Sequence, residues 1–550
     1  MSQFLLPSRI EGPIWLSPVE KAVLHKQVAM INQEIASLDS QKDIQLALLA
    51  SVKNILSPAR RVPNEVLAHI FDDVLYHPEN SKKYYVQRNI GKTLYTLSRV
   101  CVVWRYVAHN TPRLWSTLCL SIPKHMSALI GDLEWVEEWL MRSKGLPLDV
   151  YLILPQNIKH WPGCASWFNK TCDSLVDRLH KFLEKIINEP AHHRNRVSSL
   201  ILIGHSTFFS PLLKLPASSL PGLKRVFLQV TKDFSASLTQ VKAFLGAPKL
   251  REVEIIEPYE ESQLKTILLP AGQLINLKLM PGPGVVNSMF DPLIYKSFLQ
   301  QCRNLVSLEI LPPMNPIVPR YNFPTEGYIF LPVLKSLIFA CSSSIWYSGI
   351  SFLQCFIVPL LEDLDLDYGD IEFHDFCEII TKFQRQSGYI PNLRSLTVKL
   401  GSMDNTVLIP VLDFFPRINS LQLVGINFDM NFLFEAMTYN PSTEQNSLPV
   451  PKISTLELVF KMNNWDNSYP SKLLTMILSR TLPDGPGELQ VDTGAATRGK
   501  KIRHEVGVGV HRLQRVSVCG SELEKATEDV AHIAEIPSTT IYSECWDCVG

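Results

Sequence analysis

The sequence predicts an α/β protein in which N-terminal helices precede a series of strand–helix units that build a parallel sheet. Two observations support this fold class. Residues 57–120 carry apolar side chains at helical spacing, and from residue 197 onward a short apolar motif recurs along most of the chain. The chain has 550 residues, of which 46% are hydrophobic, so it can bury a large core.

The recurring motif has the form apolar-x-x-apolar-x-apolar, and its copies begin at residues 197, 223, 250, 274, 305, 334, 361, 393, 418, 453 and 513. Apolar and polar residues alternate within each copy, which is the two-residue period of a strand with one buried face. Helical stretches such as FHDFCEIITKFQRQ and SKLLTMILSRTL lie between the copies. This pattern resembles the leucine-rich repeat, and the resemblance implies a solenoid of strand–helix units.

The repeat departs from that family in two ways. The intervals between copies vary, and the asparagine that the family places after the strand is missing. That place holds His205, Thr231, Pro258, Gly282, Pro313, Ser342 and Gly369 instead. A proline often stands two residues before the first apolar position, where it ends the preceding helix. We therefore expect an irregular solenoid.

Residues 57–120 contain a helix start. Pro63 suits an early helix position because its missing N–H would have no partner there, and Glu65 suits the positive end of the helix. Four blocks then follow in the order of the F-box, which this region resembles. They are Val62-Pro63-Asn64-Glu65-Val66, Ile70-Phe71, Val100-Cys101-Val102-Val103-Trp104 and Leu114-Trp115.

The resemblance implies a three-helix module that docks on the Skp adaptor, which in turn binds a cullin. Apolar anchors on short helices would fill a groove of the partner. The implied adaptor-binding residues are Val62, Pro63, Glu65, Val66, Leu67, Ile70, Phe71, Leu97, Val100, Cys101 and Trp104. Cys101, Trp104 and Trp115 are also expected to hold the module together.

The sequence differs from the F-box pattern at two points, and the segment also has an alternative interpretation. Val62 replaces the leucine of the family, and a polar insertion from Tyr76 to about Lys92 is expected to form a surface loop between the first two helices. Buried apolar residues at helical spacing are also typical of a small helical subdomain that caps the rest of a chain.

Residues 1–56 are expected to form amphipathic helices. Leu24, Val28, Ile31, Ile35 and Leu38 step by 4, 3, 4 and 3 residues, as in a coiled-coil seam, but over only about two heptads. The seam indicates either self-association or packing on the F-box or its neighbour, and we favour packing; the oligomeric state stays open. This helix is followed by Ser-Pro-x-Arg-Arg-x-Pro-x-Glu from Ser57, by Trp139-Leu140-Met141-Arg142-Ser143 and by Pro147-Leu148. The combination resembles a large group of fungal F-box proteins.

These patterns divide the chain into five segments. They are amphipathic N-terminal helices (1–56), an F-box (57–120), a connecting α/β segment leading into the repeats (121–196), the repeat solenoid (197–482) and an irregular tail (483–550) with a candidate last repeat near 513–518. The stretches TLCLSI and DVYLIL are expected to be the first strands of the solenoid.

Composition and motifs exclude several classes of function. The 53 basic and 53 acidic residues balance, which argues against bulk nucleic-acid binding. No run of about 18 apolar residues suggests a membrane span, and the N-terminus does not resemble a signal peptide. The eleven scattered cysteines are typical of reduced thiols, so we expect a cytoplasmic or nuclear protein.

The sequence has none of the short motifs that carry known chemistry. Phosphate-binding loops, nucleophile elbows and zinc-protease motifs are missing, and the CWDC ending at Cys548 lacks the second cysteine pair that a zinc site needs. We therefore expect no cofactor, no metal and no enzymatic activity.

Outward strand positions carry a set of acidic residues, which are Glu252, Glu254, Glu309, Asp363, Asp365 and Asp367. Because adjacent strands lie about 4.8 Å apart, these acids should gather on one concave face. We predict an acidic groove, centred on the three aspartates, that selects a basic segment of an unidentified client protein. Ordinary solubilising charge explains the same pattern equally well.

The two resemblances together predict a substrate-recognition subunit of a Skp–cullin–F-box ubiquitin ligase. The F-box would bind the adaptor, and the repeats would bind the client. The alternative is a leucine-rich-repeat scaffold without a role in ubiquitination. The exposure of the Pro63–Phe71 face separates the two, because a receptor must leave apolar side chains free there and a cap would bury them.

Overall fold

The structure is a computed structural model that describes residues 15–76, 90–121, 134–154, parts of 176–186, 195–231, 240–257, 262–282, 287–288, 292–311, 315–316, 327–340, 352–367, 373–399, 405–426, 429–439, 449–460, 469–481, 513, 515–519 and 539–542. The chain divides into two compact units, a helical unit (residues 1–82 and 92–111) and a sheet unit (residues 83–91 and 112–550).

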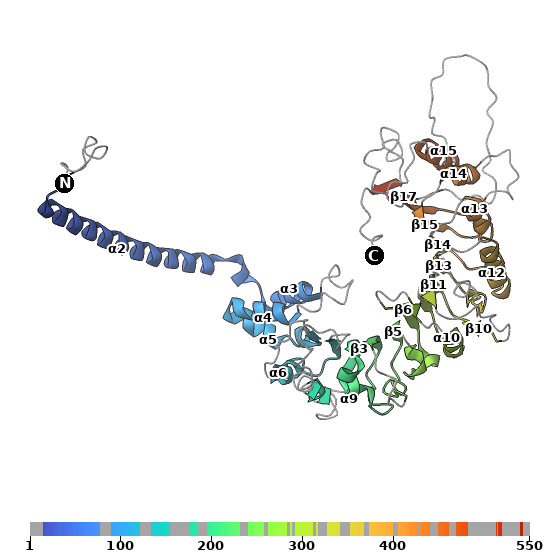
Figure 1. The fold of residues 1–550 in the computed structure, drawn as a ribbon, viewed down its shortest axis with the longest axis horizontal. Helices are drawn as coiled ribbons and strands as arrows, with labels where there is room; N and C mark the ends of the chain where they lie inside the picture. Colours follow the sequence, from blue (N-terminus) through green and yellow to red (C-terminus); the bar gives the residue numbers. More distant parts are fainter. Residues whose placement is uncertain are drawn as a thin grey trace, which may run out of the picture. The chain divides into compact units, whose positions relative to one another are not determined.

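The helical unit begins with one long helix, α2 (Pro18–Leu56), which follows a capping box formed by Ser17 and Glu20. The amphipathic helices expected in residues 1–56 are therefore one continuous helix within the described residues (Figure 1). No residue of α2, which is described along its whole length, is buried. The expected packing of this segment on the F-box helices is therefore not found.

Three shorter helices complete the helical unit after the turn η1 (Pro58–Arg61). They are α3 (Asn64–Tyr76), α4 (Ile90–Val100) and α5 (Val102–Asn110). α3 and α5 are in contact, and their interface contains the rings of Phe71 and Trp104. The expected insertion between α3 and α4 lies almost wholly outside the described residues.

The sheet unit is built on a parallel sheet whose strands follow one another in chain order. Its 14 described strands are β1 (Thr117–Ser121), β2 (Leu148–Ile153), β3 (Val197–His205), β4 (Arg225–Thr231), β5 (Glu252–Glu257), β6 (Asn276–Pro281), β8 (Ser307–Ile310), β11 (Ser336–Ala340), β13 (Asp363–Asp367), β14 (Ser395–Lys399), β15 (Ser420–Ile426), β16 (Thr455–Phe460), β17 (Arg515–Cys519) and β18 (Thr539–Tyr542). The stretches TLCLSI and DVYLIL supply β1 and β2, and the last motif copy supplies β17.

Helices and short strands fill the connections between these strands. They are η4 (Pro112–Trp115), α6 (Glu134–Arg142), η6 (Ser206–Phe209), α9 (Ser210–Leu213), η7 (Gln263–Lys265), η8 (Ala271–Gln273), β7 (Asn287–Ser288), α10 (Pro292–Leu299), β9 (Asn315–Pro316), β10 (Ile329–Phe330), β12 (Phe356–Ile357), α12 (Phe373–Gln386), α13 (Asn405–Asp413), α14 (Asn431–Met437) and α15 (Tyr469–Thr481). Figure 1 shows α10, α12 and α13 along the same side of the row of strands.

Equivalent positions of the sequence motif are register partners in the sheet. Leu308 pairs with Leu277 on one side and with Leu337 on the other, and the same register continues through the neighbouring copies. These side chains are at most 2% exposed. Because the side-chain period of a strand is two, in-register pairing brings every buried leucine to the same face and forms one continuous core.

Side chains of the connection after β5 form hydrogen bonds to the ends of neighbouring strands. The Gln263 amide donates to the carbonyl oxygens of Val230 and Ile256, at 3.0 and 3.2 Å, and so links β4 to β5. Glu257 is buried beside it and accepts hydrogen bonds from Ser262 Oγ, Gln263 N and Tyr295 Oη at 2.8, 2.8 and 2.9 Å. Burial raises the pKa of Glu257, although these hydrogen bonds act in the opposite direction.

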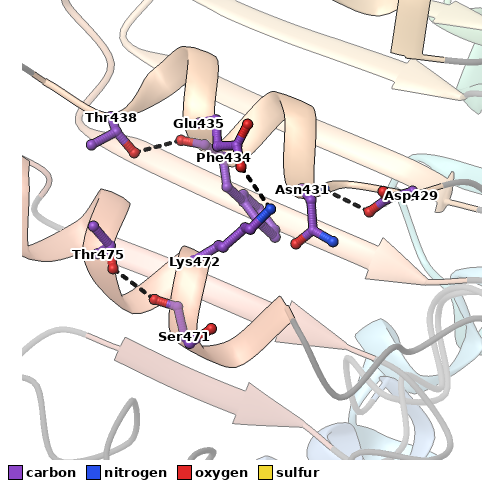
Figure 2. Close-up of polar contacts among 8 residues, drawn as sticks. All are labelled: Asp429, Asn431, Phe434, Glu435, Thr438, Ser471, Lys472 and Thr475. Atoms are coloured by element: carbon purple, nitrogen blue, oxygen red, sulfur yellow. Dashed lines mark hydrogen bonds and ion pairs between the residues drawn. The ribbon is translucent and has the colours of Figure 1, made fainter.

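Polar side chains link α14 and α15, the last two helices that the structure describes. α14 and α15 pack on each other, and Lys472 Nζ lies 2.6 Å from Glu435 Oε1 across them (Figure 2). The other bonds drawn there are local. Asn431 N–H donates to Asp429, and threonine hydroxyls donate within α14 and α15.

Candidate protein-interaction surfaces

The local sequence determines where α3 begins. The carbonyl oxygen of Pro63 accepts the Leu67 N–H at 3.0 Å, so Pro63 stands immediately before the first helical residue. Glu65 lies in the first turn, where a carboxylate interacts favourably with the helix dipole. These features orient the apolar positions that follow.

One stripe of α3 faces the core of the helical unit. Leu67 is 3% exposed and Phe71 is fully buried. The centroid of the Phe71 ring lies 5.0 Å from that of Trp104 in α5, in a tilted arrangement that is favourable for aromatic pairs. Leu67 and Phe71 therefore stabilise the unit. In the single chain neither side chain is exposed to a partner, and their role in adaptor binding stays a prediction.

The adjacent stripe of α3 is exposed. Val66, Ile70 and Val74 are 46%, 43% and 50% exposed, and their spacing of four residues places them in one row along the helix. Pro63 is also exposed. The helix therefore shows an apolar row to the outside, although it already buries a second one.

The junction between α4 and α5 exposes further apolar side chains. Cys101 is the N-cap residue of α5, and its Sγ accepts the Trp104 N–H at 3.5 Å. Arg105 Nε donates to the Ser98 carbonyl at 2.9 Å and ties α5 to the end of α4. This junction leaves Val100, Val102, Val103 and Tyr106 at least half exposed.

The residues implied by the F-box resemblance fall into three groups. Pro63, Glu65, Val66, Ile70 and Val100 are exposed; Val62, Leu97, Cys101 and Trp104 are half-buried; Leu67 and Phe71 are buried. The sequence pattern did not separate the two stripes of α3, and it missed Val74, Val103 and Tyr106. The step of four from Ile70 to Val74 was the available signal.

Trp115 lies in the sheet unit. Its ring centroid is 4.8 Å from that of Trp139 in an edge-to-face arrangement, and the Arg142 guanidinium lies 4.5 Å from the Trp115 centroid. Trp115 thus joins η4 to α6, a role in the sheet unit that the sequence pattern did not indicate.

The outward face of the sheet carries the acidic residues noted in the sequence. Asp363, Asp365 and Asp367 occupy alternate positions of β13, and Glu252, Glu254 and Glu309 occupy equivalent rows on β5 and β8. Partial burial and the nearby Glu362 raise the pKa of Asp363, whereas Arg394 lowers it. The side chain of Asp367 lies outside the described residues.

Basic residues alternate with these acids on the same face. Glu252 lies 2.8 Å from Arg225, Glu309 lies 2.9 Å from Lys278, and Asp365 lies 3.8 Å from Lys399. Each pair joins neighbouring strands. The described part of this face is therefore a mixed-charge surface, and a basic ligand would compete with these lysines and arginines for the carboxylates.

The same face is apolar over the first strands. A row in the sheet register runs through Cys119, Tyr151, Ile201 and Phe227 and then reaches Glu254 on β5. Tyr151, Ile201 and Phe227 are buried in an apolar cluster with Ile256. The outward face thus changes from apolar to charged between β4 and β5.

Two of the described thiols, Cys302 and Cys355, are buried. Burial raises the pKa of Cys302 to about 12, and it also raises the pKa of Cys355, so both stay protonated at neutral pH. Among the residues that the structure describes, no group of three or more His, Cys, Asp or Glu side chains is placed to hold a metal ion. None of the described helices has the length and apolar character needed to span a bilayer.

A row of exposed apolar side chains on a small helical unit is typical of surfaces that bind other proteins. Residues 59–121 match the F-box-like family, so the chain contains an F-box-like domain there, which suggests a protein that acts through protein–protein interaction. Domains of this family commonly bind Skp-type adaptors and occur in adaptor or receptor subunits more than in enzymes. No curated protein sequence matches the chain.

Proposed function

We propose that this protein is a substrate-recognition subunit of a Skp–cullin–F-box ubiquitin ligase. The observation that carries the proposal is the exposed row of Val66, Ile70 and Val74 inside the segment that matches the F-box-like family. A helix that buries one apolar row and leaves a second one in water is suited to a groove on a partner.

The adaptor surface in this proposal comprises the exposed residues of α3 and of the α4–α5 junction. Its members are Pro63, Val66, Ile70, Val74, Val100 and Val103. Leu67, Phe71 and Trp104 support this surface from beneath. Glu65 adds a charge at its edge, which would influence encounter and orientation more than affinity.

We further propose that the sheet unit is an irregular leucine-rich-repeat solenoid and that its outward face binds the client. The support is the order of the strands, each pairing in parallel with the next copy, and the in-register leucines beneath them. Extended faces of repeat proteins are common binding surfaces. The cell compartment in this proposal is the cytoplasm or the nucleus.

Adaptor binding is tested by co-purifying the full chain with a Skp-type adaptor. Ile70→Asp places a charge in the exposed row, and we expect at least about tenfold weaker binding. The matched control is His69→Asp, because His69 is exposed on the same helix but lies outside that row. Leu67→Asp is unsuitable as a surface test, since burying a carboxylate would disrupt the unit itself.

Two outcomes would overturn the adaptor proposal. One is a wild-type chain that does not retain the adaptor, which would favour the scaffold alternative. The other is equal loss of binding in Ile70→Asp and His69→Asp, which would show that the exposed row is not the contact surface.

The client surface is tested by reversing Asp363, Asp365 and Asp367 to lysine and comparing proximity-labelled proteins. We expect the loss of clients with basic segments. Reversal of Glu137, Glu138 and Glu435, which are exposed acids away from the sheet face, is the matched control. An unchanged list of labelled proteins would remove the acidic-groove proposal.

A further inference from the structure

Helix α2 is long and carries many apolar side chains that its own chain leaves in water. It has 39 residues and a length of about 58 Å at 1.5 Å per residue. Val28, Ile31, Ile35 and Leu38 are 46% to 58% exposed, and Leu49, Val52 and Leu56 are 49% to 61% exposed. A helix of this kind gains stability chiefly by packing an apolar face against another element.

Part of this exposed apolar surface forms a heptad seam along the helix, and other exposed residues such as Val23, Met30 and Ile44 lie outside it. With Val28 and Ile35 as a positions, the seam residues are Lys21, Leu24, Val28, Ile31, Ile35, Leu38, Lys42, Gln45, Leu49, Val52 and Leu56. The apolar seam therefore resumes in the same register after Lys42 and Gln45. Because α2 is unbroken, it offers more than the three to four heptads that are typical of stable coiled coils.

The composition of the seam indicates what covers it. Its first half has β-branched Val28 and Ile35 at a positions and leucine at two d positions, Leu24 and Leu38, a composition that favours a parallel two-stranded coiled coil. The second half instead has leucine at a and valine at d. Lysines occupy two a positions, Lys21 in the first turn and Lys42 in the middle of the seam, and a polar residue at such a position fixes the register and the number of strands at some cost in stability.

A parallel partner of the same sequence, in register, sets each polar seam residue against its own copy and covers every apolar seam residue from Leu24 to Leu56. An antiparallel pair that sets Lys42 against Gln45 would leave Leu24 and Val28 beyond the end of the partner helix, so the parallel pair buries more apolar surface.

Charge does not oppose this pairing. The helix contains four lysines (Lys21, Lys26, Lys42 and Lys53) and four acidic residues (Glu20, Glu34, Asp39 and Asp43), so its formal net charge is zero. Two copies can therefore approach without a net repulsion between the helices.

We propose that this chain forms a homodimer in which α2 pairs with α2 of a second copy as a parallel, in-register coiled coil. The dimer would carry two F-box-like domains and two sheet units on one stem. The inference does not depend on the proposed ubiquitin-ligase function, since it rests on α2 alone.

The test is the molar mass of the full chain at micromolar concentration, measured by light scattering after size exclusion. We expect twice the 62.3 kDa of one chain. Ile31→Asp with Leu38→Asp changes two d positions and should weaken dimerisation by about 100-fold or more, because four apolar side chains of the dimer become carboxylates. The matched control is Val23→Asp with Met30→Asp, two c positions with the same seven-residue spacing.

None of these four residues is buried in the single chain, so neither variant should disturb its fold, which circular dichroism would verify. A monomeric wild type would overturn the proposal and leave the seam to a different protein. A dimer that survives the seam substitutions, or one that the control substitutions also dissociate, would equally overturn it.

Orientation is tested by oxidative cross-linking of Leu24→Cys, with Met30→Cys and the wild type as controls for the natural cysteines. In the parallel pair the two Leu24 positions face each other within the reach of a disulfide. An antiparallel pairing of Leu24 with Leu56 would separate them by about 48 Å. Cross-linking specific to Leu24→Cys is expected, and its absence in a proven dimer would refute the parallel arrangement.

Discussion

In the sheet unit, leucines at equivalent motif positions such as Leu277, Leu308 and Leu337 are at most 2% exposed, whereas in the helical unit Val66, Ile70 and most of the α2 seam are about half exposed. Both regions have strongly periodic sequences. In the sheet unit each copy of the motif supplies the cover for the next, so the periodic face is buried by its own chain. In the helical unit the apolar rows of α2 and α3 are not repeated. No neighbouring copy therefore covers them, and they can contact other molecules.

Apolar residues of the same types therefore have two different roles in this chain, one in folding and one in binding. A buried leucine in a repeat stabilises the fold, and its loss should be felt throughout the sheet unit. An exposed valine on a short helix contributes little to the fold and can instead supply binding energy. Substitutions that are matched in size but differ in exposure can therefore test the contrast directly.

The largest difference is expected between two neighbouring residues of α3. Phe71→Ala should destabilise the helical unit by about 3–5 kcal/mol, because it leaves a cavity beside Trp104, whereas Ile70→Ala should change its stability by no more than about 0.5 kcal/mol. Hydrogen–deuterium exchange of α3 and α5 measures both. Similar exchange rates in the two variants would show that the buried and exposed rows of α3 contribute equally to the stability of the helical unit.

A repeat leucine tests the sheet unit in the same way. Leu308→Ala should cost about 2–5 kcal/mol, because Leu308 packs between Leu277 and Leu337, while Ser307→Ala on the outward face should cost less than about 0.5 kcal/mol. Urea unfolding followed by circular dichroism gives both values. A small effect of Leu308→Ala would contradict the continuous core.

The buried carboxylate of the sheet unit should respond to pH. Burial raises the pKa of Glu257 above its usual 4.5, so the folded chain keeps a proton that the unfolded chain releases. Its contribution therefore becomes less favourable as the pH rises from about 4.5 through the folded pKa, and then stays constant.

Tyr295→Phe removes one donor to Glu257 and should cost about 0.5–3 kcal/mol, because a buried acceptor loses a partner. The hydrogen bond from Tyr295 lowers the pKa of Glu257, so the loss should be larger above the folded pKa, where the carboxylate is charged, than below it. Thermal melts of wild type and variant over a wide pH range test this, and a difference that does not depend on pH would show that the Tyr295 hydrogen bond does not influence the titration of Glu257.

The smallest effect is expected at an exposed ion pair. Lys472→Ala should weaken the α14–α15 contact by less than about 1 kcal/mol, because both Lys472 and Glu435 lie largely in water. The difference should shrink further in high salt. A thermal shift that persists in high salt would indicate that Lys472 acts through packing.

Much of the fold could be predicted from the sequence because it depends on local periodicity. The motif copies from Val197 to Leu458 became strands, their leucines became register partners, and the F-box-like segment was recognised from four blocks. The residues missed or misplaced, such as Val74 and Trp115, lie where one element meets another. A list of residues in one helix does not show which neighbour covers each side.

By itself, the sequence determined the period of each element, and therefore which side chains share a face. Alternation by two placed Asp363 and Asp365 opposite the buried leucines, and spacing by four aligned Val66 with Ile70. Only the tertiary structure decided which face is covered: Leu67 inside and Val66 outside, Glu309 beside Lys278, and α2 left without a buried residue. The physical reason is that periodicity belongs to one element, whereas burial depends on neighbours that come from distant parts of the chain.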